Sequence, residues 1–256
     1  MYQELPIEKI DKWLWKYIQC MYIFSVTYNP KIEMEQKAMK CFVQNIINLV
    51  PNTYVKSKMT EYAYMTEEVK NVLLHNSDLE NFFRIYINIS NHIKRQRVDY
   101  NQLDFLDYCA QNNTTMVMWV YLLHCYLIIK QNRIGNFIQM PLYSSIRDTY
   151  DKDKITKDDW GNVSWFVIHT TALYASGDMK TIYYNYKAML SCLQYILPCA
   201  KCKQHLIDNL AKIDIDNCSN SRGDLFRCSW ELHNIVNESL GKYQPSLQEA
   251  FNMYKL

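Results

Sequence analysis

The chain has 256 residues, which suffices for one large domain or two modest ones with real cores. Only 5 Gly and 6 Pro beside 49% hydrophobic residues predict a mainly helical globular protein without low-complexity segments. The formal net charge of +2 at pH 7 excludes a strongly basic or acidic chain, so we expect no nucleic-acid partner.

Helical patterns fill most of the first 150 residues. Apolar residues recur at helical spacing over 7–24 and over 33–50. Further helices are predicted at about 66–75, 78–94, 102–111 and 114–130. The segment 133–153 contains Gly, Pro and several polar residues, and it predicts a domain boundary. We therefore expect a helical N-terminal region, 1–150, of unassigned role, and a second domain, 151–256.

No segment has the pattern of a membrane span or a targeting signal. The most apolar stretch, 116–129, is too short to cross a bilayer and contains His124, which favours a buried helix. The N-terminal residues MYQELP lack the apolar core of a secretory signal and the Arg-rich character of a transit peptide. We expect the cytoplasm or the nucleus as the location, with the mitochondrial intermembrane space as the alternative.

The C-terminal domain is predicted to be an all-α bundle of four to five helices. Its first helix opens at Thr156, where Asp159 completes an approximate capping box, and it stops before Gly177. The second helix is predicted at about 180–197, and the third contains Cys199 and Cys202. The fourth is predicted at about 222–239, and a short last helix follows Pro245. So many helices in about 100 residues form a compact bundle.

Cysteine spacing gives the most specific signal. Cys20, Cys41, Cys109 and Cys125 each stand alone in an apolar helical pattern and are predicted to be small buried hydrophobes. Cys199 and Cys202 instead form a CxxC motif at a predicted helix start, where the helix dipole favours thiolates. Lys201 and Lys203 add positive charge there. Alone, the motif is compatible with a redox couple, half a zinc site or two ordinary thiols.

Polar and aromatic side chains line two other predicted helices. Trp165 and His169 are four residues apart, so they share one helix face. His233 and Asn237 repeat this spacing on the fourth helix of the bundle, and Asn234 lies beside them. Each residue alone is more often a core side chain. Together they supply the stacking surface and ring-nitrogen partners that a heteroaromatic ligand requires.

Three segments, in this order, resemble successive motifs of the Erv/ALR sulfhydryl oxidases. They are 160–169 (WGNVSWFVIH), 197–205 (LPCAKCKQH) and 230–242 (WELHNIVNESLGK). Ser221 and Arg222 also stand where the family often has a Ser-Arg pair. The resemblance covers about 155–254, and three ordered motifs are far more specific than a CxxC alone.

The resemblance implies a bundle that binds FAD and oxidises thiols of protein substrates, with no metal. The residues implied to contact the flavin are Gly161, Trp165, His169, His233, Asn234, Asn237 and Lys242. Cys202 would face the flavin, and Cys199 would be the outer sulfur that substrate thiols attack. Electrons would pass from a substrate dithiol through the pair and FAD to O₂, giving hydrogen peroxide. The family also implies a homodimer, and its baculovirus-type viral members similarly carry an extra N-terminal helical region.

The sequence departs from the family pattern at its structural disulfide. Trp230 stands where members often have a cysteine, and no cysteine follows Cys228. Cys218 and Cys228 could form a replacement disulfide, and two free thiols are the alternative. There is no second CxxC to act as a shuttle, so we expect substrates to reach Cys199 directly.

Two alternatives compete with the oxidase interpretation. In the first, Cys199 and Cys202 combine with two of His205, Cys218 and Cys228 in a structural zinc module. This alternative leaves the tryptophan, histidine and asparagine pattern unexplained. In the second, the fold is kept but catalysis is lost, and the protein is a scaffold or binding module. The intact CxxC weighs against that alternative.

Overall fold

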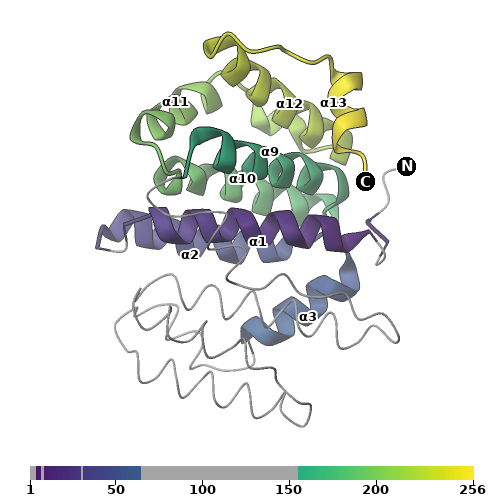
Figure 1. Cartoon of the computed structure of the whole chain (residues 1–256). Coiled ribbons are helices and arrows are strands. Elements are labelled where there is room, and N and C mark those ends of the chain that lie inside the picture. The colour runs from purple at the N-terminus through teal and green to yellow at the C-terminus, as the bar shows by residue number, and fades with distance from the viewer. Residues whose placement is uncertain (1–3, 7–8, 30, 65–154) are drawn as a thin grey trace.

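The computed structural model describes residues 4–6, 9–29, 31–64 and 155–256. The elements in these ranges are α1 (Ile10–Thr27), α2 (Glu33–Asn48), α3 (Thr53–Tyr64), α9 (Lys157–Tyr174), α10 (Met179–Ile196), α11 (Ala200–Leu210), the short 3₁₀ helix η2 (Ile215–Cys218), α12 (Arg222–Ser239) and α13 (Leu247–Tyr254) (Figure 1). The described ranges contain no strand, which confirms the predicted all-α fold class.

The first two predicted helices correspond to α1 and α2, but α3 was not predicted. Its start carries a signal that could have been recognised, because the side-chain oxygen of Asn52 accepts the N–H of Val55 (3.0 Å) as a helix cap does. The predicted helices between 66 and 130, the boundary within 133–153, and Cys109 and Cys125 lie outside the described residues.

Local capping signals fix where the C-terminal helices begin. The side-chain oxygen of Thr156 accepts the N–H of Asp159 (3.3 Å), and the Asp159 carboxylate accepts the N–H of Thr156 (2.8 Å), so the predicted capping box is confirmed. Ser246 and Glu249 form a second capping box at the start of α13. These short-range contacts explain why the helix starts could be predicted from sequence.

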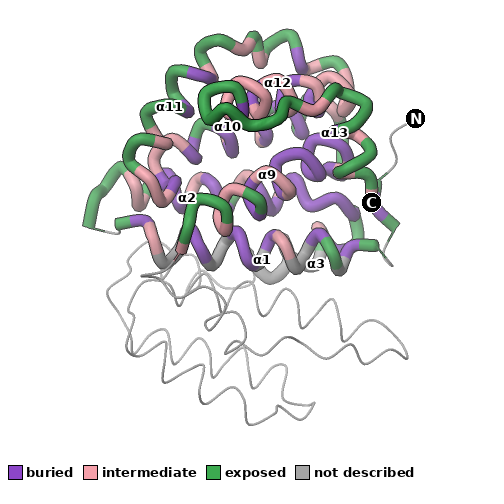
Figure 2. The backbone as a smooth tube through the Cα atoms, turned by 45° about the horizontal axis from the view of Figure 1, so that its top comes forward, coloured by how far each residue is buried: buried purple, intermediate pink, exposed green. Residues whose placement is uncertain are grey.

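The N-terminal helices pack directly on the C-terminal bundle. Helix α1 lies against α9, and α2 lies against α10 (Figure 1). Large side chains of α1 and α2, among them Trp13, Phe24 and Phe42, are buried in the same core as residues of α9 and α10. Figure 2 shows the buried residues, in purple, gathered where the N-terminal helices meet the C-terminal bundle. A division of the chain into two domains near residue 150 stays a prediction, since the boundary segment lies outside the described ranges.

Polar contacts also connect the N-terminal helices to the C-terminal bundle. Ser176, just after α9, donates its hydroxyl to the carbonyl of Val50 (2.7 Å), and Lys56 donates to the Ser176 carbonyl (2.9 Å). Cys20 is buried as predicted, with its sulfur 3.8 Å from the Ser164 hydroxyl, and burial raises its pKa to about 12. Cys41 is only half-buried, so the prediction for it holds in part.

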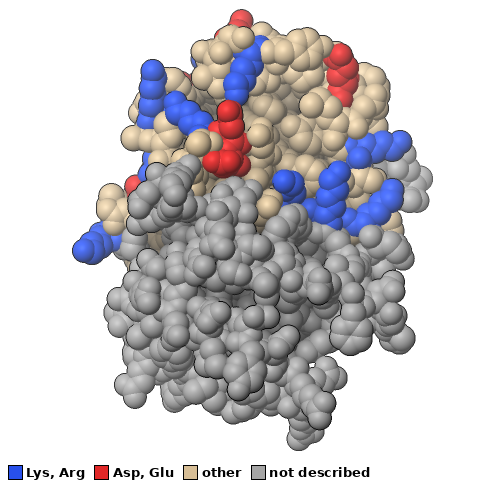
Figure 3. Space-filling model, in the orientation of Figure 1, with Lys and Arg blue, Asp and Glu red and all other residues tan. Residues whose placement is uncertain are grey.

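The described helices show no membrane-spanning candidate, since none is both long and apolar enough to cross a bilayer. On the face seen in Figure 3, the Lys and Arg side chains of the described part form several small groups, separated by uncharged surface.

Candidate redox and ligand site

Cys199 and Cys202 form a disulfide at the N-terminus of α11, with their Cα atoms 5.1 Å apart. Helix α10 ends at Ile196, and Cys199 is the N-cap of α11, so its sulfur accepts the N–H of Cys202 (3.2 Å). Both residues are half-buried; Cys202 packs against the hydrophobic core, and Cys199 is not part of that packing. A sulfur that already accepts a backbone N–H at a helix N-terminus is stabilised as a thiolate after reduction.

The two predicted histidines hydrogen bond to each other across the interface between α9 and α12. The Ser229 hydroxyl donates to the Phe226 carbonyl (2.7 Å), so it accepts the Nδ1–H of His169 (2.8 Å). His169 Nε2 therefore has a free lone pair, which accepts the Nδ1–H of His233 (2.9 Å). This chain of bonds leaves Nε2 of a neutral His233 as an acceptor.

Both imidazoles are held neutral at pH 7. Burial, and then the neighbouring His233, lower the pKa of His169 well below its usual value. Burial, and then the positive charge of Lys242, lower the pKa of His233 to about 4. A neutral His169 is what the hydrogen-bond chain requires, because its ring must donate to Ser229 and accept from His233.

Trp165 completes an aromatic cluster with the two imidazoles. Its ring stacks on that of His233 with centroids 4.0 Å apart and planes 8° from parallel. Its centroid lies 5.5 Å from that of His169. The structure therefore brings together three residues that lie up to 68 positions apart in the chain (165 to 233).

A cavity of about 440 Å³ opens beside this cluster. It is lined by His169, Trp230, His233, Asn234, Asn237, Tyr243, Pro245, Glu249, Ala250, Asn252, Met253 and Tyr254. Four of the predicted ligand residues line it: His169, His233, Asn234 and Asn237. Trp165, Gly161, Lys242 and the two sulfurs of the CxxC pair are not among its lining residues. A volume of this size is typical of a small-molecule site.

Asn234, one of the residues that line this cavity, has an unsatisfied acceptor. Its amide N–H donates to the Pro245 carbonyl (3.1 Å), which also accepts the indole N–H of Trp230 (2.7 Å). Its Oδ1 is buried and has no hydrogen-bond partner among the described residues. An unsatisfied buried acceptor costs about 1–3 kcal/mol, so this side chain suits a ligand that brings a ring N–H.

Two further predicted ligand residues, Lys242 and Gly161, lie near the start of α9. Gly241 has φ +63° and ends α12, and the N–H of Lys242 then bonds back to the Asn237 carbonyl (2.8 Å). The Lys242 ammonium lies 3.1 Å from the Asp158 carboxylate in the first turn of α9. A side chain at Gly161 would meet nothing within 4 Å. Asp158, which Lys242 contacts, and Gly161 thus precede Trp165 and His169 on α9. From Asp158 to His169 the helix rises by about 16 Å.

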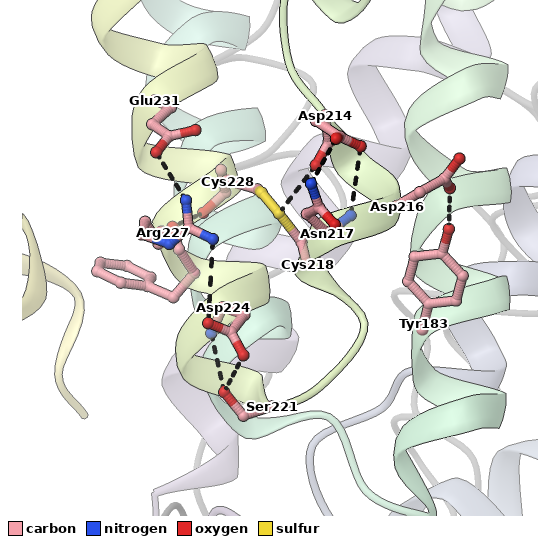
Figure 4. Close-up of a disulfide and its surroundings, with 12 residues drawn as sticks. Tyr183, Asp214, Asp216, Asn217, Cys218, Ser221, Asp224, Arg227, Cys228 and Glu231 are labelled. Carbon is pink, nitrogen blue, oxygen red and sulfur yellow. Dashed lines mark hydrogen bonds and ion pairs between the residues drawn. A yellow bond between two sulfur atoms is a disulfide. The ribbon is translucent and has the colours of Figure 1, made fainter.

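The second disulfide, Cys218–Cys228, joins η2 to α12 and is fully inside the protein (Figure 4). Its Cα atoms are 6.4 Å apart, within the usual range for a disulfide. In Figure 4 it lies between Asp214, whose carboxylate accepts from Asn217, and Arg227, which pairs with Glu231 (2.9 Å). The two cysteines are therefore paired and not free thiols.

The zinc alternative would need these cysteines as free thiolates. The structure instead uses Cys199, Cys202, Cys218 and Cys228 in two disulfides. Among the described residues no group of three or more His, Cys, Asp or Glu side chains is arranged to hold a metal ion. His205 is exposed.

Two contributors to the site were missed from the sequence. Ser229 lies four residues before His233, so the helical spacing that identified Asn237 could have identified it too. Tyr254 of α13 has its ring centroid 4.2 Å from that of His169, and burial raises its pKa to about 12. No local signal predicted that α13 folds back on α9.

Comparisons with known proteins match the same region. The model of the Erv1/Alr family matches residues 162–255. A provisionally named FAD-linked sulfhydryl oxidase of Invertebrate iridescent virus 3 is 30% identical over 101 residues, which is 38% of this chain and 66% of that protein. Another, from Acanthamoeba polyphaga mimivirus, is 30% identical over 98 residues, 38% of this chain and 68% of that protein.

A plant protein matches as well. The FAD-linked sulfhydryl oxidase ERV1 of Arabidopsis thaliana is 30% identical over 104 residues, 39% of this chain and 53% of that protein. The chain thus spans just under two thirds of the iridescent-virus relative and about half of the plant relative. No solved structure matches the chain significantly.

Proposed function

We propose, from the premise that this chain belongs to the Erv1/Alr family, that its C-terminal bundle is an FAD-dependent thiol oxidase. The relatives' names support FAD and sulfhydryl oxidation. The observation that carries the proposal is the Cys199–Cys202 disulfide at a helix N-terminus, on a bundle that also holds the His169–His233 cluster.

The residues present fit a flavin. An isoalloxazine ring offers one N–H beside ring carbonyls and nitrogens, and the site offers an unsatisfied Asn234 acceptor and an acceptor nitrogen on His233. The residues that would hold it are Gly161, Trp165, His169, His233, Asn234, Asn237 and Lys242. When bound, FAD supplies two-electron acceptor chemistry, with O₂ as the final acceptor and hydrogen peroxide as the product.

The CxxC pair performs the exchange with the substrate. A substrate thiolate attacks Cys199, the disulfide breaks, and Cys202 leaves as a thiolate that the helix N-terminus stabilises. A second substrate thiolate then attacks the mixed disulfide, forms the substrate disulfide and releases Cys199. The half-buried Cys199 and the core-packed Cys202 support this division of roles.

The histidine pair keeps the ligand face in one hydrogen-bonding state. Because Ser229 fixes the Nδ1–H tautomer of His169, His233 must donate to His169 and present its Nε2 as an acceptor. The depressed pKa of both rings keeps a positive charge away from this face at neutral pH.

The proposed partners are protein dithiols that reach Cys199 directly, O₂, and a second copy of the chain in a homodimer, and the proposed location is the cytoplasm or the nucleus. Light scattering on purified protein distinguishes a dimer from a monomer. Fractionation of expressing cells tests the location.

Purified protein tests the activity. We expect a yellow preparation with a flavin band near ~450 nm that consumes O₂ when a dithiol is added. Cys199→Ser and Cys202→Ser should abolish turnover but keep the bound flavin, whereas Cys20→Ser, which removes a buried lone thiol, should keep both. A colourless preparation that contains zinc would contradict the proposal. Full activity in Cys202→Ser would contradict the role given to that sulfur.

A further inference from the structure

An ion pair shielded from solvent connects the N-terminal helices to the helix that carries the CxxC pair. The Nζ of Lys203 on α11 lies 2.6 Å from Oε1 of Glu35 on α2. The two side chains are 23% and 15% exposed, whereas the other ion pairs of the described residues are more exposed. This pair is thus the best shielded among them.

Both carboxylate oxygens of Glu35 are used, which fixes its position. Oε2 accepts the N–H of Asn29 (2.7 Å) in the connection between α1 and α2. The Asn29 side chain in turn accepts the N–H of Lys31 (3.0 Å). The carboxylate is therefore held by the backbone of the α1–α2 connection while its other oxygen faces Lys203.

Lys203 directly follows the inner cysteine of the pair. Its N–H donates to the Cys199 carbonyl (2.9 Å), so it belongs to the first turn of α11, where thiolates form on reduction. Because Lys203 follows Cys202 in the first turn of α11, its charge contributes to the electrostatic field at those thiolates. An unpaired lysine there would stabilise the reduced pair, whereas a paired one stabilises it less.

We propose that Glu35 sets the reduction potential of the Cys199–Cys202 pair by neutralising Lys203. The inference rests on the proposed role of this pair as the redox couple, and it gives α2 a part in that role. Glu35 acts through Lys203 and is a positioning residue. Because it offsets a positive charge, it keeps the disulfide less oxidising than the α11 N-terminus alone would make it.

The test is the glutathione equilibrium of the pair, measured by alkylation and mass spectrometry of the peptide that contains both cysteines. In Glu35→Gln the charge is lost, and the single amide oxygen can accept from Asn29 or from Lys203 but not from both, so the double variant with Lys203→Gln is needed to isolate the effect of the charge. We expect the equilibrium constant to shift about threefold toward the dithiol, a rise in potential of ~14 mV at 29.6 mV per tenfold. Lys203→Gln should shift it about threefold the other way, and the double variant should return close to the parent.

Glu33→Gln is the matched control, since Glu33 lies in the same turn of α2 but is 78% exposed and pairs with Lys37 on its own helix. It should leave the equilibrium unchanged. The inference is overturned if Glu35→Gln behaves like Glu33→Gln, if it lowers the potential, or if it shifts the potential in the same direction as Lys203→Gln. Should Glu35→Gln fail to fold, Lys203→Gln decides alone, and an unchanged potential there overturns the inference.

This measurement needs no turnover, so it separates the inference from the proposed function. A chain with shifted potentials that consumes no O₂ with a dithiol would contradict the oxidase proposal and leave the role of Glu35 standing. If the protein oxidises dithiols but all variants have the same reduction potential, the oxidase proposal is supported and the role of Glu35 is contradicted.

Discussion

The two disulfides of this protein differ in where the fold puts them. Cys199–Cys202 lies at the N-terminus of α11, with both residues half-buried and the N–H of Cys202 bonded to the Cys199 sulfur. Cys218–Cys228 is buried between η2 and α12 (Figure 4). This difference suits the exchange role that we propose for the first disulfide and a role in holding α12 in place for the second. What distinguishes them is access and thiolate stabilisation.

The largest expected difference is in turnover. Cys199→Ser should lower dithiol oxidation by more than ~10³-fold, because Cys202 then has no disulfide partner for a substrate thiolate to attack. Cys218→Ser combined with Cys228→Ser should keep activity within about threefold in the folded fraction. An oxygen electrode measures both, and equal losses would break the comparison.

The rates at which a small reductant cleaves the two disulfides should differ almost as much. Under native conditions a small thiol reductant reaches the half-buried Cys199 but not Cys218, which is fully buried. We expect the CxxC pair to be reduced at least ~100-fold faster than the buried pair. Timed quenching with an alkylating reagent and peptide mass spectrometry gives both rates. Reduction of the two disulfides at similar rates would contradict the structural role of the second.

The buried disulfide should contribute more to stability. It closes a loop of ten residues, and loss of such a link costs about 2–3 kcal/mol. The CxxC link closes only three residues, so its loss should cost about 1 kcal/mol less. Urea unfolding of the two double serine variants measures this order, and the opposite order would show that the CxxC link is the structural one.

Acid should destabilise the helix that the buried disulfide holds. The pKa of His233 is about 4 in the folded protein and about 6.5 unfolded, so the unfolded state binds more protons between these values. The contribution of His233 should therefore be full above pH 6.5 and should fall by about 3 kcal/mol as the pH drops to 4, and the loss from His169, whose pKa is also lowered, adds to it. Urea unfolding against pH measures the slope. His233→Asn should reduce the slope to the part that His169 contributes, and an equal slope in that variant would contradict the assignment.

The smallest expected effect concerns the ligand face. Asn234→Leu removes an acceptor that has no partner among the described residues, so it should weaken FAD binding about tenfold with little effect on the stability of the flavin-free chain. Fluorescence titration with FAD measures the affinity. Unchanged affinity would show that this acceptor does not meet the flavin.

Features encoded by neighbouring residues could be predicted from the sequence. Cys199 at a helix start and the Thr156 capping box each depend on contacts within four residues. The family resemblance implied that Trp165 and His233 belong to one flavin site, but their direct stacking was not predicted, since helix spacing gives only the face of each helix. The order of the three motifs carried the information that the two residues share a site.

Features that depend on long-range packing could not be predicted. The contact of Glu35 with Lys203 joins residues 168 positions apart, and Tyr254 reaches His169 only because α13 folds back over α9. No periodicity in α2 or α13 indicates which helix it meets. The buried pairing of Cys218 with Cys228 was equally open, because spacing alone permits it without requiring it.

The most direct test of the account is an anaerobic titration of the purified, flavin-loaded protein with a dithiol, followed near ~450 nm. The account predicts that the flavin band bleaches as about one dithiol per flavin is added, and that Cys199→Ser does not bleach while Cys218→Ser combined with Cys228→Ser does. A band that persists in excess dithiol, or that bleaches equally without Cys199, would contradict the claim that this pair delivers electrons to the flavin.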